Sequence, residues 1–153
     1  MNHRSPGWIP QNLWKKIVTH MPIVSIDLII RTEEGILLGK RTNKPAKGKW
    51  FVPGGRLKKD ESITSAVHRI AETEIGIDVQ IVRKIGVYEH FYDVSDIADS
   101  VPKHYIANAY IVEANEHKFS KDFQHDELKF HQNLTSDIHN YTKEYINIVN
   151  ASG

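Results

Sequence analysis

Residues 54–77 read GGRLKKDESITSAVHRIAETEIGI, and this stretch carries the clearest structural signal in the chain. Its apolar residues recur at the i, i+3, i+4, i+7 spacing of one helix face between Ile63 and Ile70. Asp60 stands just before this face and Gly76 just after it, as expected at the two ends of a helix. The Gly54-Gly55 pair predicts a break where the backbone takes unusual angles. The stretch therefore predicts a glycine turn followed by a helix.

The charged residues in and before this stretch suit phosphate chemistry. Carboxylates beside a main-chain carbonyl favour a hard cation such as Mg²⁺, and Mg²⁺ in turn favours phosphate. Between Lys40 and Lys59 there are eight basic residues and no acidic one. Such a run attracts anions, although a charge run by itself is more often a solvated surface.

Strands are predicted on both sides of the helix. β-Branched density and turn residues predict strands at 23–31, 36–41, 50–52, 79–89, 105–112 and 127–131. The first two form a hairpin candidate, and the strands at 79–89 and 105–112 pair as a hairpin with a long loop. Helical spacing predicts a short helix after Pro10 and a terminal helix from Ile138 onward. The expected fold class is α+β, a mixed β-sheet sandwiched between helices.

Composition places the chain among globular proteins. It has 153 residues, of which 40% are hydrophobic and 25% charged, with a net charge of +1, so we expect one domain over 1–153 with residues 1–9 loosely ordered. There is no cysteine, which excludes thiol nucleophiles and thiolate zinc sites. The longest apolar stretch, 23–30, is too short to span a bilayer, and no secretory signal is visible. We therefore expect a cytoplasmic protein with no membrane partner.

Residues 54–77 resemble the Nudix box, the loop-helix-loop signature of hydrolases that act on nucleoside diphosphates linked to another group. Ala71 fits an apolar position of the box loosely, and two positions depart from it, because Ile70 and Thr73 stand where the box has Glu. Six fixed positions match: Gly55, Glu61, Arg69, Glu74, Gly76 and Ile77.

The departures point to a Nudix subgroup, the GDP-mannose mannosyl hydrolases, whose box is altered in this way. The resemblance covers about residues 21 to 132. It is carried by the stretches 38–45, 50–56, 89–93, 103–105 and 124–126.

The resemblance implies a reaction at carbon. Conventional Nudix hydrolases attack phosphorus, and their carboxylates gather more than one divalent ion. In the subgroup, water attacks the anomeric carbon of the sugar and releases GDP with inversion. The implied substrate is GDP-mannose, with GDP-glucose as a further candidate, and a homodimer is implied as well.

One Mg²⁺ per active site is implied by the same resemblance. Its ligands would be Glu74, the side-chain oxygen of Gln124 and a main-chain carbonyl of Gly54 or Gly55. Waters and the diphosphate would complete an octahedron.

The other site residues are carried over in the same way. Arg41 and Arg56 match the arginines that neutralise the diphosphate, a task that suits the planar guanidinium. His125 matches the general base. Glu61 and Arg69 are expected to form an ion pair that supports the loop-helix-loop. Further positions that contact the sugar or the diphosphate are Asp27, His90 and Tyr105.

Three alternatives stay open. A conventional Nudix pyrophosphohydrolase would release GMP and sugar 1-phosphate, but Ile70 and Thr73 count against it. A non-catalytic nucleotide-sugar sensor could bind with an eroded box. A nucleic-acid module could use the basic run with Trp50 and Phe51 as stacking groups, but this leaves the carboxylates unexplained. The expected partner is therefore a small-molecule nucleotide sugar and not a nucleic acid.

Overall fold

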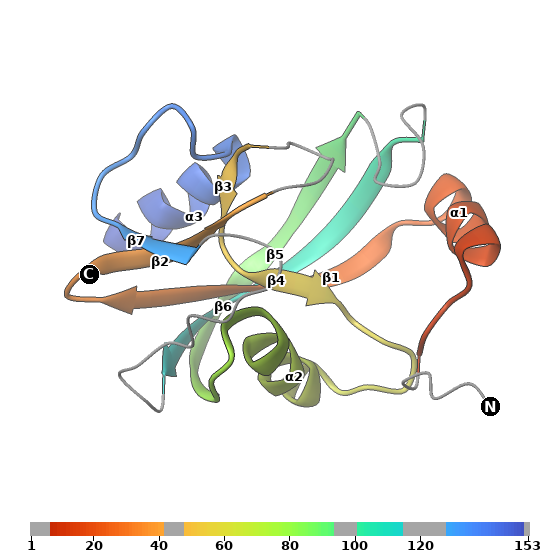
Figure 1. The fold of residues 1–153 in the computed structure, drawn as a ribbon, viewed down its shortest axis with the longest axis horizontal. Helices are drawn as coiled ribbons and strands as arrows, with labels where there is room; N and C mark the ends of the chain where they lie inside the picture. The colour runs from red at the N-terminus through yellow and green to blue at the C-terminus, as the bar shows by residue number, and fades with distance from the viewer. Residues whose placement is uncertain (1–6, 42–47, 94–100, 115–127, 152–153) are drawn as a thin grey trace.

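A computed structural model describes residues 7–41, 48–93, 101–114 and 128–151. Along this part of the chain there are three helices and seven strands (Figure 1). They are α1 (Gln11–His20), β1 (Ile23–Thr32), β2 (Gly35–Lys40), β3 (Trp50–Phe51), β4 (Gly54–Arg56), α2 (Ile63–Ile75), β5 (Val79–Tyr92), β6 (Lys103–Ala114), β7 (Leu128–His131) and α3 (Asn140–Ala151).

Strand β1 lies at the centre of a mixed sheet. It pairs in parallel with β6 and antiparallel with β4, and its last residues pair antiparallel with β2. The sheet order is β3-β2-β1-β6-β5, with β4 attached to β1 and β7 attached to β2. The antiparallel pairing of β5 with β6 confirms the predicted hairpin. The α+β class with a mixed sheet is confirmed as well.

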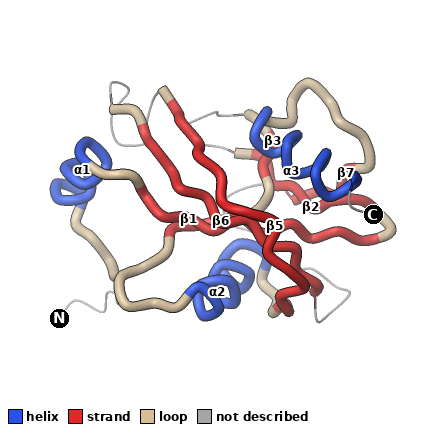
Figure 2. The backbone as a smooth tube through the Cα atoms, turned by 180° about the vertical axis from the view of Figure 1, so that it is seen from behind, coloured by secondary structure: helices blue, strands red, loops and turns tan. Residues whose placement is uncertain are grey.

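Helices α2 and α3 cover opposite faces of the sheet (Figure 2). Because side chains alternate along a strand, Ile26, Leu28 and Ile30 of β1 pack in the core under α2. Ile29 packs in the second core, under α3. The same alternation places Asp27 on the face that α3 covers.

The Gly54-Gly55 pair is a strand and not the predicted turn. It forms β4, in which Gly54 lies opposite Asp27 and Gly55 opposite Ile26. A Cβ on Gly54 would lie 2.4 Å from Asp27 Oδ1 and 2.7 Å from the Ile26 carbonyl oxygen. Glycine is therefore required here because the two strands approach closely, and not because of an unusual φ.

Helix α2 ends as predicted and begins differently. Gly76 closes it in the left-handed conformation, with φ 73°, and its N–H donates to the carbonyls of Ala71 and Glu72. The cap at the other end is Ser62, whose hydroxyl accepts from the Ser65 N–H at 3.1 Å. Asp60 instead stands in the preceding turn with φ 64°.

The remaining boundaries differ by a few residues from the predictions. Strands β5 and β6 run further toward their connecting loop than predicted, because each residue there still has a ladder partner. The terminal helix starts at Asn140, since Ile138 forms a bridge to Trp50 instead. Residue 127, the predicted start of β7, lies outside the described residues. None of the described helices is long and apolar enough to cross a membrane.

Candidate active site

A pocket of about 200 Å³ opens where β1, β4, β5 and β6 meet α3. Its wall brings together most of the site residues expected from the sequence, and their roles remain predictions. The expected residues in the wall are Asp27, Arg41, Gly54, Gly55, Arg56, His90 and Tyr105. The wall also contains aromatic residues that sequence reasoning did not assign to the site, namely Trp14, Phe51, Tyr92, Tyr141 and Tyr145.

Glu74 lies near the end of α2 and does not line the pocket. Gln124 and His125 lie outside the described residues, as do Lys44 and Lys47 of the basic run.

The predicted metal ligands fit a hard cation by their chemistry. In the described part of the chain, no three residues of the types His, Cys, Asp and Glu could together hold a metal ion. The expected set is different, because it uses the Glu74 carboxylate, the Gln124 side-chain oxygen and a glycine carbonyl, and oxygen donors suit Mg²⁺. Gly55 lies against Ile70, one turn before Glu74 on α2, so the strand with the carbonyl and the helix with the carboxylate are neighbours.

A hydrogen-bonded group of three side chains forms one side of the pocket. The Tyr145 hydroxyl donates to Asp27 Oδ2 at 2.7 Å, and it lies 3.4 Å from His90 Nε2. Burial raises the pKa of Asp27 to about 6, although the bond from Tyr145 opposes this shift. Burial, with a smaller contribution from His139, lowers the pKa of His90 to about 4. At neutral pH, Asp27 is therefore ionised and His90 is neutral.

Aromatic rings hold His90 and the neighbouring wall in place. The His90 ring stacks on Tyr141 with centroids 4.0 Å apart and planes 8° apart. The Tyr141 hydroxyl accepts from the Phe91 N–H at 2.9 Å and donates to the Phe91 carbonyl at 3.1 Å. Tyr92 packs edge-on against Tyr105 and Tyr141. These contacts join α3 to β5 and β6, so the wall is a packed surface.

Two arginines give the pocket positive charge. Arg56 donates to the Gly7 carbonyl at 2.8 Å, and its guanidinium lies 5.4 Å from the ring centroid of Trp14. Burial, followed by the nearby Arg69, lowers the pKa of Arg56, which stays charged at neutral pH. The Arg41 guanidinium lies over Phe51 at 5.8 Å. An anionic group of a ligand would find both guanidinium groups in the same wall.

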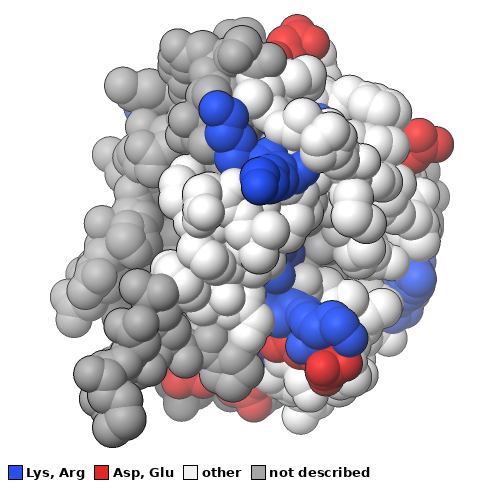
Figure 3. All heavy atoms as spheres, turned by 90° about the vertical axis from the view of Figure 1, so that its right-hand side faces the viewer, with Lys and Arg blue, Asp and Glu red and all other residues white. Residues whose placement is uncertain are grey.

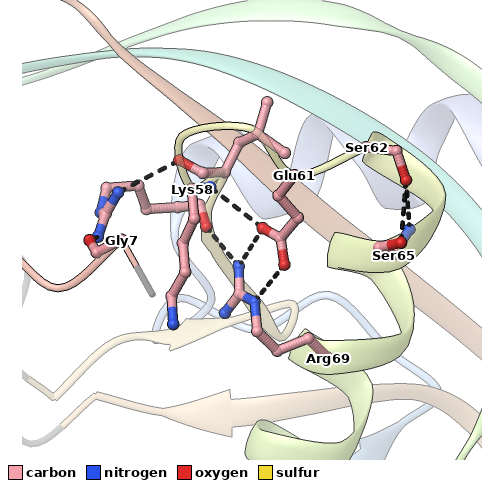
Figure 4. Close-up of polar contacts among 8 residues, drawn as sticks. Gly7, Lys58, Glu61, Ser62, Ser65 and Arg69 are labelled. Atoms are coloured by element: carbon pink, nitrogen blue, oxygen red, sulfur yellow. Dashed lines mark hydrogen bonds and ion pairs between the residues drawn. The ribbon is translucent and has the colours of Figure 1, made fainter. Parts of the chain in front are cut away.

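Glu61, in the loop before α2, forms an ion pair with Arg69 of α2 (Figure 4). Arg69 donates from Nε and Nη2 to the two carboxylate oxygens of Glu61 at 2.7 and 2.9 Å, and from Nη2 to the Arg56 carbonyl at 2.8 Å. The Lys58 N–H donates to Glu61 at 3.1 Å. The hydrogen bond from Arg69 is the main reason that the pKa of Glu61 is lowered. The pair thus ties β4, the loop and α2 together outside the pocket wall.

Figure 3 shows one face of the molecule, on which the described Lys and Arg side chains are blue. Lys and Arg side chains lie there in separate groups, with uncharged surface between them. Lys59 pairs with Asp60 at 3.1 Å. Trp50, a stacking group in the nucleic-acid alternative, is only 7% exposed and packs in the core under α3. A buried indole is not available to stack on a base.

The two departures from the Nudix box occupy different environments. Ile70 is 1% exposed and belongs to the core between α2 and β1, whereas Thr73 lies on the exposed side of α2. A Cβ on Gly55 would lie 3.2 Å from Ile70 Cγ1, so the isoleucine fills the space beneath β4. A carboxylate at position 70 would thus enter a packed apolar core.

Ile70→Glu should therefore unfold at a lower urea concentration than the wild type. Burial of a charge without a partner should lower the free energy of unfolding by about 3–5 kcal/mol. Thr73→Glu is the matched control, because it adds the same group on the exposed side of the same helix and should change stability by less than about 0.5 kcal/mol. Equal stability of the two variants would show that position 70 tolerates a carboxylate.

The raised pKa of Asp27 predicts a pH-dependent effect of Asp27→Asn. Between about pH 4 and pH 6 the Asp27 carboxyl loses its proton in the unfolded chain but keeps it in the folded chain. The wild type therefore loses stability as the pH rises through this range. Asn stays neutral, so at pH 8 the variant should be more stable than the wild type by up to about 3 kcal/mol, an upper limit because pocket water screens the charge.

Urea unfolding of both proteins at pH 4.0 and pH 8.0 measures this difference. The advantage of the variant should be largest at pH 8 and small at pH 4. A variant that is less stable than the wild type at pH 8 would contradict the prediction.

Comparisons with known proteins agree on one family. The model of the NUDIX domain matches residues 21–140. The low-salt glycan biosynthesis protein Agl8 of Haloferax volcanii is 44% identical over 138 residues, which are 90% of this chain and 88% of that protein.

Solved structures share the fold. A MutT NUDIX hydrolase from Burkholderia pseudomallei superposes with a TM-score of 0.70 at 26% identity, over 85% of this chain and 99% of that one. A bifunctional NMN adenylyltransferase/ADP ribose pyrophosphatase from Francisella tularensis, complexed with AMP and a Mn ion, superposes with a TM-score of 0.57 at 21% identity. This superposition covers 93% of this chain and 45% of the Francisella chain.

Proposed function

Because the chain belongs to the NUDIX family of hydrolases, we propose that it hydrolyses GDP-mannose, or GDP-glucose, to GDP and free sugar. The observation that carries this proposal is the joint presence of Arg41, Arg56, Asp27 and His90 in one pocket. The two guanidinium groups suit a diphosphate, and the carboxylate and imidazole suit the hydroxyls of a sugar.

The altered box supports attack at carbon. Position 70 is a buried isoleucine, so it offers no carboxylate for a second metal ion. Nudix hydrolases generally use divalent metals, and a Mg²⁺ held by Glu74, Gln124 and a glycine carbonyl would help to neutralise the diphosphate. A leaving group whose charge is neutralised in this way can depart while water attacks elsewhere.

The proposed reaction is a single displacement at the anomeric carbon. His125 takes a proton from water, and the water oxygen forms the new bond to the anomeric carbon. The bond from this carbon to the β-phosphate oxygen breaks, and GDP leaves with the electron pair. Arg41 and Arg56 stabilise the charge on the departing diphosphate, while Asp27, His90 and Tyr105 contact the sugar or the diphosphate.

The name of Agl8 links that protein to glycan biosynthesis, and a nucleotide sugar is a substrate class that suits such a role. A homodimer, which the family resemblance implies, belongs to the same proposal. So do the cytoplasmic location and the lack of nucleic-acid or membrane partners that we expect from the sequence. The rival within the family is a pyrophosphohydrolase that attacks phosphorus, and Glu74 is the box carboxylate that supports it.

Product analysis distinguishes the candidates. The protein is incubated with GDP-mannose and Mg²⁺, with a parallel sample that contains chelator, and the products are separated by chromatography. GDP and free mannose, with β-mannose as the first anomer seen by NMR, are expected only without chelator. GMP with mannose 1-phosphate would show attack at phosphorus, and tight binding without turnover would favour a sensor.

His125→Ala should lower kcat by about 10²-fold or more, because a general base contributes about 10²- to 10⁴-fold. GDP affinity should stay nearly unchanged, since the proposed base acts on water and not on the diphosphate. His68→Ala is the matched control, because His68 is on α2, pairs with Asp78 at 2.7 Å and does not line the pocket. Equal turnover of the two variants would remove His125 from the mechanism.

A further inference from the structure

Tyr145 joins the core under α3 to the pocket. Its side chain is 1% exposed, and its ring packs edge-on against Tyr88 at 5.3 Å and tilted against His90 at 5.7 Å. Its hydroxyl nevertheless reaches Asp27, and the residue lines the pocket. Tyr145 lies beyond the residues 21–140 that the NUDIX model matches, so the family match assigns it no role.

The hydroxyl of Tyr145 has one proton, and this fixes the direction of its hydrogen bonds. The short hydrogen bond from this hydroxyl to Asp27 Oδ2, 2.7 Å away, uses that proton. The hydroxyl then has only lone pairs to offer to His90 Nε2, at 3.4 Å. A contact between these two atoms is favourable only if Nε2 carries the imidazole proton.

Asp27 and His90, the two residues that the Tyr145 hydroxyl contacts, are also held by other neighbours. Asp27 Oδ1 occupies the space next to Gly54, where a Cβ would lie 2.4 Å from it. The carboxylate is thus confined by Gly54 on one oxygen and by Tyr145 on the other. The His90 ring cannot rotate freely, because it stacks on Tyr141 at 4.0 Å. The hydroxyl is the polar link between these two confined groups.

We propose that Tyr145 is a positioning residue of the active site, which orients the Asp27 carboxylate and holds His90 as the Nε2–H tautomer. Its role in turnover rests on the proposed function, because it acts through residues that would contact the sugar. Removal of the hydroxyl leaves the carboxylate free to turn, so recognition of the sugar should suffer. Binding of GDP, which lacks the hexose of the nucleotide sugar, should not suffer.

Tyr145→Phe tests this proposal, since it keeps the ring in the core and removes the hydroxyl. Tyr88→Phe is the matched control, because its hydroxyl donates to the Ile85 carbonyl at 3.3 Å and Tyr88 does not line the pocket. We expect kcat/KM for GDP-mannose to fall about tenfold to a hundredfold in Tyr145→Phe, the loss typical of a hydrogen bond to a charged group. The inhibition constant of GDP should stay within about twofold in both variants.

The tautomer of His90 is the second readout, and it does not require turnover. Nitrogen-15 NMR of the labelled wild-type protein should show His90 protonated at Nε2 alone, and Tyr145→Phe should show a mixture or the Nδ1–H form. A wild-type His90 protonated at Nδ1 would overturn the proposal, even if the variant does not fold. Kinetics of Tyr145→Phe equal to those of Tyr88→Phe would also overturn it.

The two readouts separate this proposal from the function on which it rests. If the wild type does not turn over GDP-mannose, the proposed function fails, and the tautomer measurement still decides whether Tyr145 fixes His90. If GDP inhibition weakens as much as kcat/KM in Tyr145→Phe, the residue supports the whole pocket and its positioning role is rejected.

Discussion

The close approach of β4 to β1, where Gly54 lies opposite Asp27, is the constraint on which the site depends. The absence of a Cβ at Gly54 leaves room for the Asp27 carboxylate, with Oδ1 next to the β4 backbone. The same pairing places Arg56 opposite Ser25 and brings it to the pocket wall. A larger residue at 54 would displace either the carboxylate or the strand, and both belong to the pocket.

The two faces of the sheet have separate tasks that meet at β4. The face under α2 holds the Nudix box, in which the Glu61–Arg69 pair ties the loop to the helix and Ile70 packs beneath Gly55. The face under α3 holds the aromatic wall and the hydrogen bond from Tyr145 to Asp27. Because Gly54 and Gly55 line the pocket while Gly55 contacts α2, residues from both faces can act on one ligand.

The pocket combines a half-buried carboxylate with neutral and cationic groups. Burial raises the pKa of Asp27 only to about 6 and lowers the pKa of His90 to about 4, so at neutral pH Asp27 is charged and His90 is not. The negative charge of Asp27 therefore shares the pocket wall with two arginines. Keeping a carboxylate partly dehydrated costs folding free energy, and such a cost is common where a protein holds polar groups ready for a ligand. The hydrogen bond from Tyr145 offsets part of it.

The sequence by itself determined the regular elements and the Nudix box, because both depend on spacing within short stretches. Periodicity located α2, with its end at Gly76, and the β-branched runs located the strands. Tertiary structure alone decided that Gly54-Gly55 is a strand and that Tyr145 belongs to the site. Tyr145 and Asp27 are 118 residues apart. The helical spacing of apolar residues places Tyr145 in the core, but it is the same whether or not the hydroxyl contacts a carboxylate. Only the packing of α3 across β1 brings these two groups together, and no local pattern records such a contact.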